Sequence, residues 1–196
     1  MKYPVITITR EFGSGGRTIA RQLAEKLGYD YYDYNLVQKI AKESGLAESY
    51  IEEHGEDANS ESSLSFAWNN WDGSMSDQLY VVQRNTIMDL AEKGKCVIVG
   101  RCSDYILRDR EDTFHVFIHA DPKFRQNRIV NVYGETDESI EKRVAKKDKR
   151  RIAYYKYYTD RKWGQANNYH ICLNSGLLGI DECVRVISEF VSDNAK

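Results

Sequence analysis

The sequence predicts an α/β fold built on a parallel sheet, and two observations support this. Short apolar runs typical of buried strands alternate along the 196 residues with longer stretches whose apolar residues recur at helical spacing. The first run, which contains Val5, Ile6 and Ile8, leads directly into a glycine-rich turn and an amphipathic helix. One domain spanning residues 1–196 is expected, because a chain of this length supports a single well-buried core.

The glycine-rich turn (residues 11–16) predicts a binding site for phosphate groups. Its glycines let backbone amides approach an anion closely, and the helix that follows points its free N–H groups at the same place. The expected phosphate-binding residues are Gly13, Ser14, Gly15, Gly16, Arg17 and Thr18. The alternative is a turn that only packs the helix against the strand.

The turn matches the P-loop pattern G-x-x-x-x-G-K-[ST] only in part. The aligned residues are Glu11, Gly16, Arg17 and Thr18. Thr18 keeps a hydroxyl that can bind Mg²⁺, whereas Arg17 brings a planar guanidinium where a compact ammonium is usual. If the register is shifted by one residue, Gly16 takes the lysine position and the turn supplies no cation there.

The composition narrows the classes of protein to consider. The net charge is −2 and the isoelectric point about 6.1, which excludes a globally basic nucleic-acid-binding protein. The four cysteines have neither metal-binding nor paired spacing, so reduced thiols in the cytoplasm are expected. No run approaches the ~20 apolar residues of a membrane span, and the amino-terminal residues lack the apolar region of a signal peptide. Small molecules, rather than nucleic acid or membranes, are the expected partners.

The first helix is expected to end at Gly28, and residues 29–32 form a short second strand. Asp33 is the expected N-cap of a second helix, which carries Lys39. Residues 46–73 are first acidic, then rich in serine and then aromatic, which predicts an inserted segment. Its aromatic cluster consists of Phe66, Trp68 and Trp71. This cluster is expected to pack on the core or on a second subunit of a homodimer, with stacking on a substrate as the alternative.

A further helix is expected to end at Gly94, ahead of a buried strand over residues 96–99. Arg101 follows the carboxyl end of this strand, and open parallel sheets bind ligands at that edge. An anion-binding role for Arg101 is therefore expected. The alternative is a surface arginine that caps nearby carbonyl groups.

The next strand is expected over residues 114–118, and Asp121 caps the helix that follows it. This helix carries Arg125 and Arg128, which are three residues apart and therefore lie on one face. The last strand is expected over residues 169–173. Asp181 is the expected cap of a closing amphipathic helix.

A strongly basic helix is expected from Glu138 onward. Its cationic residues are Lys142, Arg143, Lys146, Lys147, Lys149, Arg150 and Arg151. Like charges this dense repel one another on a helix unless an anion joins them, so anion binding is favoured over a solvated face. The stretch from Lys142 to Lys162 also interleaves cations with tyrosines. Tyrosines that pack inward at the end of a helix are the preferred interpretation, with binding of single-stranded nucleic acid as the alternative.

Taken together, these stretches resemble the cytidylate kinase-like family, which is related to the nucleoside monophosphate kinases, over nearly the whole chain. The segments that carry the resemblance are residues 8–17, Tyr32-Asp33, residues 99–101, residues 117–122, residues 148–151, residues 154–158 and residues 174–176. The resemblance implies five parallel strands flanked by helices, a monophosphate-binding insertion over residues 33–75 and a basic lid over residues 135–165.

The same resemblance implies phosphoryl transfer from ATP, with Mg²⁺, to a nucleoside monophosphate such as CMP or dCMP. The turn would hold the phosphates of ATP, and Thr18 would bind the metal. The hypothesis assigns catalytic roles to Arg17, Arg101, Asp148 and Arg151, with Arg17 supplying the charge of the missing lysine. It assigns substrate binding to Asp33, Lys39, Arg101, Arg128, Arg143 and Arg150.

Two departures from the family pattern leave other functions open. The loop lysine is replaced by Arg17 or absent, and Cys102 stands where the family has an acidic residue near the acceptor. The alternatives are a nucleotide-binding regulatory protein without turnover, and a P-loop kinase that acts on a small molecule other than a nucleotide.

Overall fold

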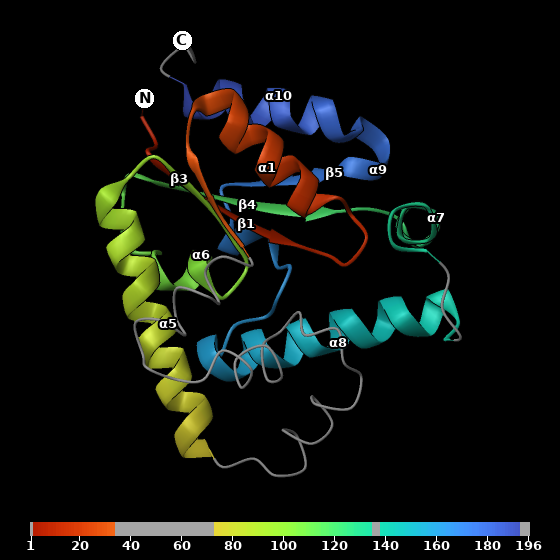
Figure 1. The fold of residues 1–196 in the computed structure, drawn as a ribbon, viewed down its shortest axis with the longest axis horizontal. Coiled ribbons are helices and arrows are strands. Elements are labelled where there is room, and N and C mark those ends of the chain that lie inside the picture. The colour runs from red at the N-terminus through yellow and green to blue at the C-terminus, as the bar shows by residue number, and fades with distance from the viewer. Residues whose placement is uncertain (1, 34–72, 135–137, 193–196) are drawn as a thin grey trace.

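The computed structural model describes residues 2–33, 73–134 and 138–192, and a five-stranded parallel sheet lies at their centre (Figure 1). The strands are β1 (Val5–Arg10), β2 (Asp30–Tyr32), β3 (Cys96–Val99), β4 (Thr113–His119) and β5 (Ile171–Asn174). Their order across the sheet is β2-β3-β1-β4-β5, and every neighbouring pair is parallel. The prediction of an α/β fold with a five-stranded parallel sheet is therefore confirmed.

β1 is the central strand, and all six of its residues are buried. It pairs on one side with β3, with Val5 opposite Cys96, and on the other with β4, with Val5 opposite Thr113. Because the strands are parallel, their carboxyl ends meet at one edge of the sheet. Arg10 ends β1 and Gly100 follows β3, so both lie at this edge.

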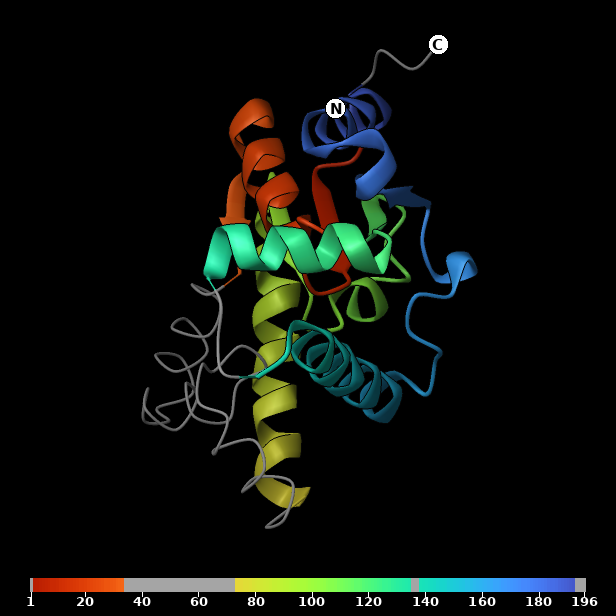
Figure 2. The same ribbon diagram turned by 90° about the vertical axis from the view of Figure 1, so that its right-hand side faces the viewer.

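Helices cover both faces of the sheet (Figures 1 and 2). α1 (Gly16–Leu27) and α10 (Ile180–Val191) lie on one face. α5 (Gly73–Lys93), α6 (Ser103–Ile106) and α8 (Ile140–Thr159) lie on the other. α7 (Pro122–Tyr133) packs beside the glycine-rich turn, α9 (Ser175–Leu178) follows β5, and a 3₁₀ turn spans Ala166–Asn168.

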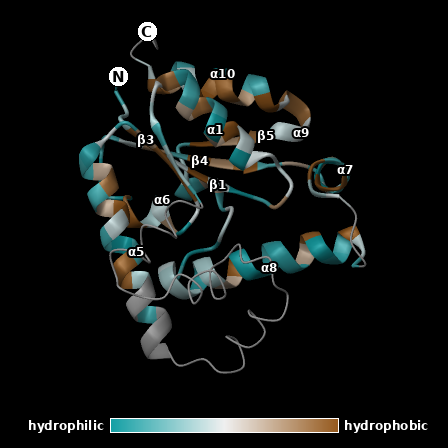
Figure 3. Cartoon of the chain, viewed as in Figure 1, coloured by the Kyte–Doolittle hydropathy of each residue, from teal (hydrophilic) through white to brown (hydrophobic). Residues whose placement is uncertain are grey.

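Each face of the sheet has its own apolar core. Ile8 packs with Leu23 of α1 and Ile187 of α10 on the first face, while Ile98 packs with Leu90 of α5 on the second. Figure 3 shows the contrast between the apolar strands and α8, which is mostly hydrophilic. Within the described part of the chain, no helix has the length and apolar character needed to cross a membrane.

The predicted ends at Gly28, Gly94 and Asp121 are confirmed, whereas α8 begins at Ile140 rather than Glu138, and the helix expected after Asp33 lies outside the described residues. Gly28 ends α1 with a φ of 64°, and the Asp121 side chain caps α7 by accepting from the Phe124 N–H at 3.0 Å. Asp181 is not a cap, because α10 begins directly after Gly179 and Asp181 lies in its first turn. A carboxylate is also favourable there, beside the free N–H groups of the helix.

Some strand boundaries differ from the prediction by one or two residues. The Tyr29 N–H still bonds to a carbonyl of α1 at 2.8 Å, so β2 begins only at Asp30. The last strand begins at Ile171, because the 3₁₀ turn precedes it. The predicted second helix with Lys39 and the aromatic cluster of Phe66, Trp68 and Trp71 lie outside the described residues.

A buried polar cluster lies on the second face of the sheet, around His115 of β4. Its imidazole Nδ1 lies 2.8 Å from the Thr7 hydroxyl, and its backbone N–H donates to His170 Nδ1 at 2.9 Å. The two imidazole rings stack with their centres 4.9 Å apart. Burial first, and then the charges of His170 and Arg161, lower the pKa of His115 to about 4. His115 is therefore neutral at physiological pH.

A buried carboxylate joins α8 to the sheet. Asp104 of α6 accepts a hydrogen bond from the Thr9 hydroxyl of β1 at 3.1 Å and one from the Tyr155 hydroxyl of α8 at 2.7 Å. Burial raises the pKa of Asp104, and the two hydrogen bonds oppose this rise. Cys102, which replaces the acidic residue of the family pattern, is itself buried. Asp104 thus fixes the position of α8 rather than facing a ligand.

We expect the free energy of unfolding to depend on His115 at acid pH. The folded-state pKa of about 4 lies below the ordinary value of 6.5, so between these pH values only the unfolded state takes up the proton. Stability should therefore fall as the pH drops through this window, by about 3 kcal/mol. Urea unfolding at pH 7 and pH 4 should show a smaller pH effect in His115→Leu than in the wild type. Equal pH effects would contradict the assignment.

Tyr155→Phe should destabilise the fold by about 1.5–3 kcal/mol, because it removes a hydrogen bond to a buried carboxylate. Tyr157→Phe is the matched control on the same helix, since Tyr157 is 52% exposed, and it should change stability by less than about 0.5 kcal/mol. Urea denaturation at pH 7 measures both. Equal stability of the two variants would show that the contact with Asp104 contributes nothing.

Candidate functional site

The turn between β1 and α1 depends on two glycines. Gly13 and Gly15 have φ angles of 83° and 81°, in the left-handed region that favours glycine. A Cβ on Gly13 would also lie 2.8 Å from the carbonyl oxygen of Arg125, and one on Gly15 would overlap Ile180. This backbone conformation ahead of a helix N-terminus is typical of anion-binding turns.

Ser14 stabilises the turn from inside the fold. Its hydroxyl lies 2.9 Å from the carbonyl oxygen of Glu11 and 3.2 Å from that of Ile118, and its side chain is fully buried. Its own carbonyl accepts from the Ser175 hydroxyl at 2.5 Å, which links the turn to α9. Its N–H also lies 3.3 Å from the carbonyl oxygen of Glu11, so both the side chain and the backbone of Ser14 stabilise the turn.

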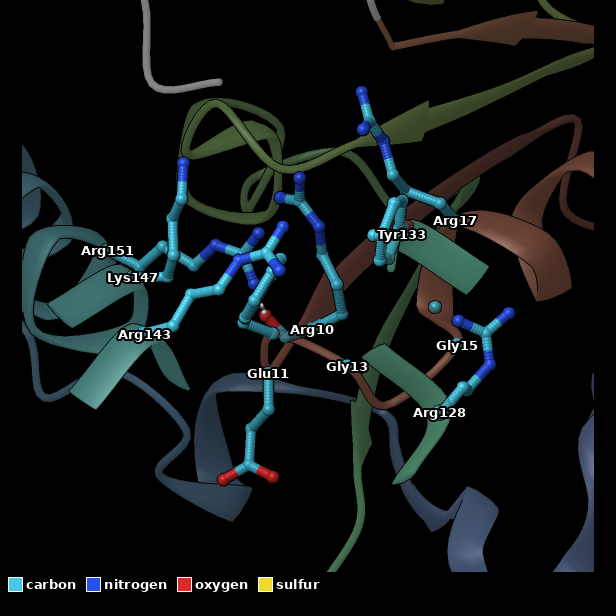
Figure 4. A pocket seen from close by; sticks show the side chains of 12 residues that line it. Arg10, Glu11, Gly13, Gly15, Arg17, Arg128, Tyr133, Arg143, Lys147 and Arg151 are labelled. Atoms are coloured by element: carbon cyan, nitrogen blue, oxygen red, sulfur yellow. Dashed lines mark hydrogen bonds between the residues drawn. The ribbon is translucent and has the colours of Figure 1, made fainter. Parts of the chain in front are cut away.

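A cationic pocket of about 100 Å³ lies beside the turn (Figure 4). The described residues that line it are Arg10, Glu11, Phe12, Gly13, Gly15, Gly16, Arg17, Arg128, Tyr133, Arg143, Lys147 and Arg151. Six of these are cationic, and Glu11 is the only acidic residue among them. Figure 4 shows the Glu11 carboxylate directed away from the arginines. The pocket is therefore suited to a ligand with several negative charges.

Three of these cations come from one face of α8. Arg143, Lys147 and Arg151 are spaced four residues apart, so they lie one above another on the helix. Figure 4 shows all three side chains reaching from α8 into the pocket. Arg143 also donates to the carbonyl oxygen of Gly134 at 3.3 Å. α8 thus places three positive charges beside the glycine-rich turn.

Asp148 holds α8 against the turn. Its carboxylate accepts from the Phe12 N–H at 2.8 Å and forms a short ion pair with Arg125 of α7. Arg125 in turn lies 3.5 Å from the Glu11 carboxylate and donates to the Phe12 carbonyl at 3.3 Å. The turn, α7 and α8 are therefore joined by one network of ion pairs and hydrogen bonds.

Arg151 lies against the same turn, one helical turn beyond Asp148. Its Nη1 donates to the carbonyl oxygen of Arg10 at 3.1 Å and lies 3.9 Å from the Asp148 carboxylate. Its guanidinium carbon lies 5.6 Å from the centre of the Phe12 ring, within cation–π range. The structure thus brings both residues of the predicted lid pair to the glycine-rich turn, while their catalytic roles stay predictions.

Arg17 lies at the edge of the pocket, where its Nε contacts the carboxylate of Asp33 at the end of β2. Asp33 is buried and also accepts from the Tyr31 hydroxyl at 2.9 Å. Burial, and then the charge of Asp33, raise the pKa of Tyr31, so its hydroxyl remains a hydrogen-bond donor. The predicted loop cation is therefore directed toward the carboxyl end of β2.

Thr18, the predicted metal ligand, accepts a hydrogen bond from Arg128 Nη2 at 2.7 Å. A hydroxyl oxygen has two lone pairs, so this contact leaves one for a metal. The described residues contain no group of three His, Cys, Asp or Glu that could hold a metal ion. Mg²⁺ is commonly bound by one or two carboxylates together with substrate phosphates, so Thr18 would supply one ligand and the phosphates of the substrate the others.

Arg101 lies in a strained turn after β3. Gly100, Arg101 and Cys102 all have left-handed φ angles, of 70°, 60° and 55°, and non-glycine residues rarely adopt this conformation. Gln83 Nε2 donates to the carbonyl oxygen of Arg101 at 3.1 Å. Burial raises the pKa of the Tyr154 hydroxyl, and the nearby charge of Arg101 partly opposes this rise. Strain of this kind is frequent at functional sites.

The structure brings half of the predicted site residues to the pocket. Gly13, Gly15, Gly16, Arg17, Arg128, Arg143 and Arg151 line it. Thr18, Asp33 and Asp148 do not line it, but each contacts an arginine that does. Ser14, Arg101 and Arg150 do not line it either, and Lys39 lies outside the described residues.

Sequence reasoning did not select Arg10 or Lys147. Arg10 ends a strand at the edge where Arg101 was selected, and Lys147 lies midway between Arg143 and Arg151 at helical spacing. The strand-end position of Arg10 and the helical spacing of Lys147 could therefore both have been recognised in the sequence.

Comparison with solved structures supports the fold. An uncharacterized protein from Eubacterium ventriosum ATCC 27560 shares 27% identity and a TM-score of 0.74, over 96% of this chain and 98% of that one. Shikimate kinase from Bacteroides thetaiotaomicron shares 17% identity and a TM-score of 0.55, over 95% and 96% of the two chains. Shikimate kinase from Acinetobacter baumannii, solved with shikimate, shares 15% identity and a TM-score of 0.56, over 98% and 95%. The fold is therefore that of the P-loop kinases.

Comparison with protein sequences identifies the family. No curated protein matches the chain. The profile of the cytidylate kinase-like family matches residues 5–177, which include the glycine-rich turn, α7 and α8. The chain therefore belongs to the cytidylate kinase-like family, as its motifs predicted.

Proposed function

We propose that the protein is a phosphotransferase that moves a phosphoryl group from ATP to a nucleoside monophosphate, with CMP or dCMP as the preferred acceptor. The observation that carries this proposal is the convergence of six cations, from β1, α1, α7 and α8, on one glycine-rich turn. Phosphoryl transfer requires positioning and neutralisation of charge, with little covalent chemistry by the protein. Membership of the cytidylate kinase-like family supports the same reaction.

In this proposal the amides of residues 13–18 hold the phosphates of the donor. Mg²⁺, when bound beside Thr18, would neutralise part of the phosphate charge. Arg143 and Arg151 reach the pocket from α8, where they add positive charge and help to exclude water. Asp148 keeps both arginines in place, because its contacts fix α8 to the turn.

The acceptor phosphate would bind at the carboxyl ends of β2 and β3, beside Asp33 and Arg101. Arg17 reaches this side through its contact with Asp33, so it would contribute charge between donor and acceptor. A phosphate acceptor is already ionised near neutral pH, so the reaction needs no general base.

The proposal predicts ADP formation from ATP and Mg²⁺ in the presence of one nucleoside monophosphate. Purified protein should be assayed with CMP, dCMP, UMP and AMP, with coupled detection of ADP. Arg101→Ala should lower turnover at least about a hundredfold, because it removes a cation from the acceptor side. Arg185→Ala is the matched control, since Arg185 is paired with Glu182 and Glu189 on the surface of α10. Undiminished turnover in Arg101→Ala would contradict this role.

A second candidate is phosphorylation of an acceptor other than a nucleotide. Two solved structures with this fold are named as shikimate kinases, so shikimate should be included in the assay. A third candidate is nucleotide binding without turnover, which is favoured by the replacement of the loop lysine by Arg17 and by the contact of Arg17 with Asp33. ATP binding without phosphorylation of any acceptor would support this third function.

A further inference from the structure

Arg10 occupies an unusual position in the pocket. It is the last residue of the central strand β1 and is only 4% exposed, yet its side chain lines the pocket. Figure 4 shows it rising between the α8 cations and Arg17. Its carbonyl oxygen accepts from Arg151 Nη1 at 3.1 Å. A strand residue of the central sheet therefore places a buried guanidinium beside the glycine-rich turn.

Two glycines from different elements make room for this side chain. A Cβ on Gly16 would lie 2.5 Å from Cβ of Arg10 and 2.8 Å from its Cγ. A Cβ on Gly100 would overlap Nη1 and lie 3.3 Å from Cζ. Gly16 has an ordinary helical φ, so the space that Arg10 needs, rather than backbone conformation, explains the glycine there. The Arg10 side chain thus extends from the glycine-rich turn to the turn that carries Arg101.

We propose that Arg10 supplies the buried cation that contacts the phosphate chain, the role for which the P-loop pattern uses a lysine at the position of Arg17. This inference rests on the proposed binding of phosphates at the glycine-rich turn. Arg17 itself contacts Asp33 at the edge of the pocket, whereas Arg10 lies between the donor and acceptor sides of the sheet.

Burial gives Arg10 a physical advantage for this role. A charge–charge interaction is stronger in a buried, low-dielectric site than at the surface. A guanidinium can also contact two phosphate oxygens at once, which a lysine ammonium does not do with the same geometry. Because the backbone at Gly16 and at Gly100 lies so close to Arg10 that neither could carry a Cβ, the side chain has little freedom before a ligand arrives, and little reorganisation is needed on binding.

The test is binding of inorganic tripolyphosphate and of ADP to the full chain without Mg²⁺, measured by isothermal titration calorimetry. Arg10→Gln should weaken both interactions at least tenfold, which corresponds to about 1.4 kcal/mol. Arg17→Gln should lose less, because its guanidinium is already on Asp33. Arg185→Gln removes the same charge from the surface of α10 and should bind as the wild type does.

Folding of each variant is checked by circular dichroism and thermal unfolding. If Arg10 only supports the fold, Arg10→Gln melts at a lower temperature but binds tripolyphosphate with wild-type affinity when folded, and the proposal is overturned. If Arg10→Gln does not fold, Arg10→Met, which removes the charge and keeps an apolar stem in the buried site, carries the test, with an expected loss of at least about tenfold. Unchanged affinity in Arg10→Met would then overturn the proposal.

The same titrations separate this inference from the proposed kinase activity. Wild-type protein that binds tripolyphosphate through Arg10 but phosphorylates no acceptor would support the role of Arg10 and refute the kinase proposal. Wild-type protein that binds neither tripolyphosphate nor ADP would overturn the inference itself.

Discussion

The ion pair between Asp148 and Arg125 is the contact on which the cationic pocket depends. Their side chains are only 14% and 11% exposed, so their attraction is screened far less than that of a surface pair. Both also bond to the backbone of Phe12. Removing either partner would leave a poorly solvated charge and detach α8 from the turn. The position of the α8 cations in the pocket therefore depends on this contact, together with the hydrogen bond that joins Tyr155 of α8 to Asp104.

The pocket concentrates positive charge that the fold has to stabilise without a ligand. The six cations that line the small cavity repel one another. Acidic residues that contact these cations, or lie close to them, reduce the repulsion. Asp148 and Asp33 each contact an arginine that lines the pocket, and Glu11 contacts Arg125 just behind it. A bound phosphate chain would supply the remaining negative charge. From this charge distribution we expect anion binding and the docking of α8 to be coupled.

The sequence was sufficient for the fold but only partly sufficient for the site. Buried apolar runs, glycines with left-handed φ such as Gly13, and caps such as Asp121 are local signals, and the structure confirms them. The contact of Arg17 with Asp33 is not local, since it depends on how α1 and β2 meet across the sheet. Lys147 could have been selected by helical spacing from Arg143, whereas the dense charge of the helix made its members hard to distinguish. The orientation of a long cationic side chain is set by its tertiary contacts, which spacing alone does not describe.

The replacement of the loop lysine illustrates why a motif has to be judged in three dimensions. Phosphate binding requires a positively charged group close to the phosphate oxygens, and cationic side chains from several positions in the chain can place one there. In this chain the residue at the lysine position contacts Asp33, while a strand residue, Arg10, enters the pocket through space left by Gly16 and Gly100. A lysine on α1 would keep four flexible bonds, whereas Arg10 is confined by the sheet and by both glycines. The altered motif is therefore compatible with a phosphate site whose charge has moved from the helix to the strand.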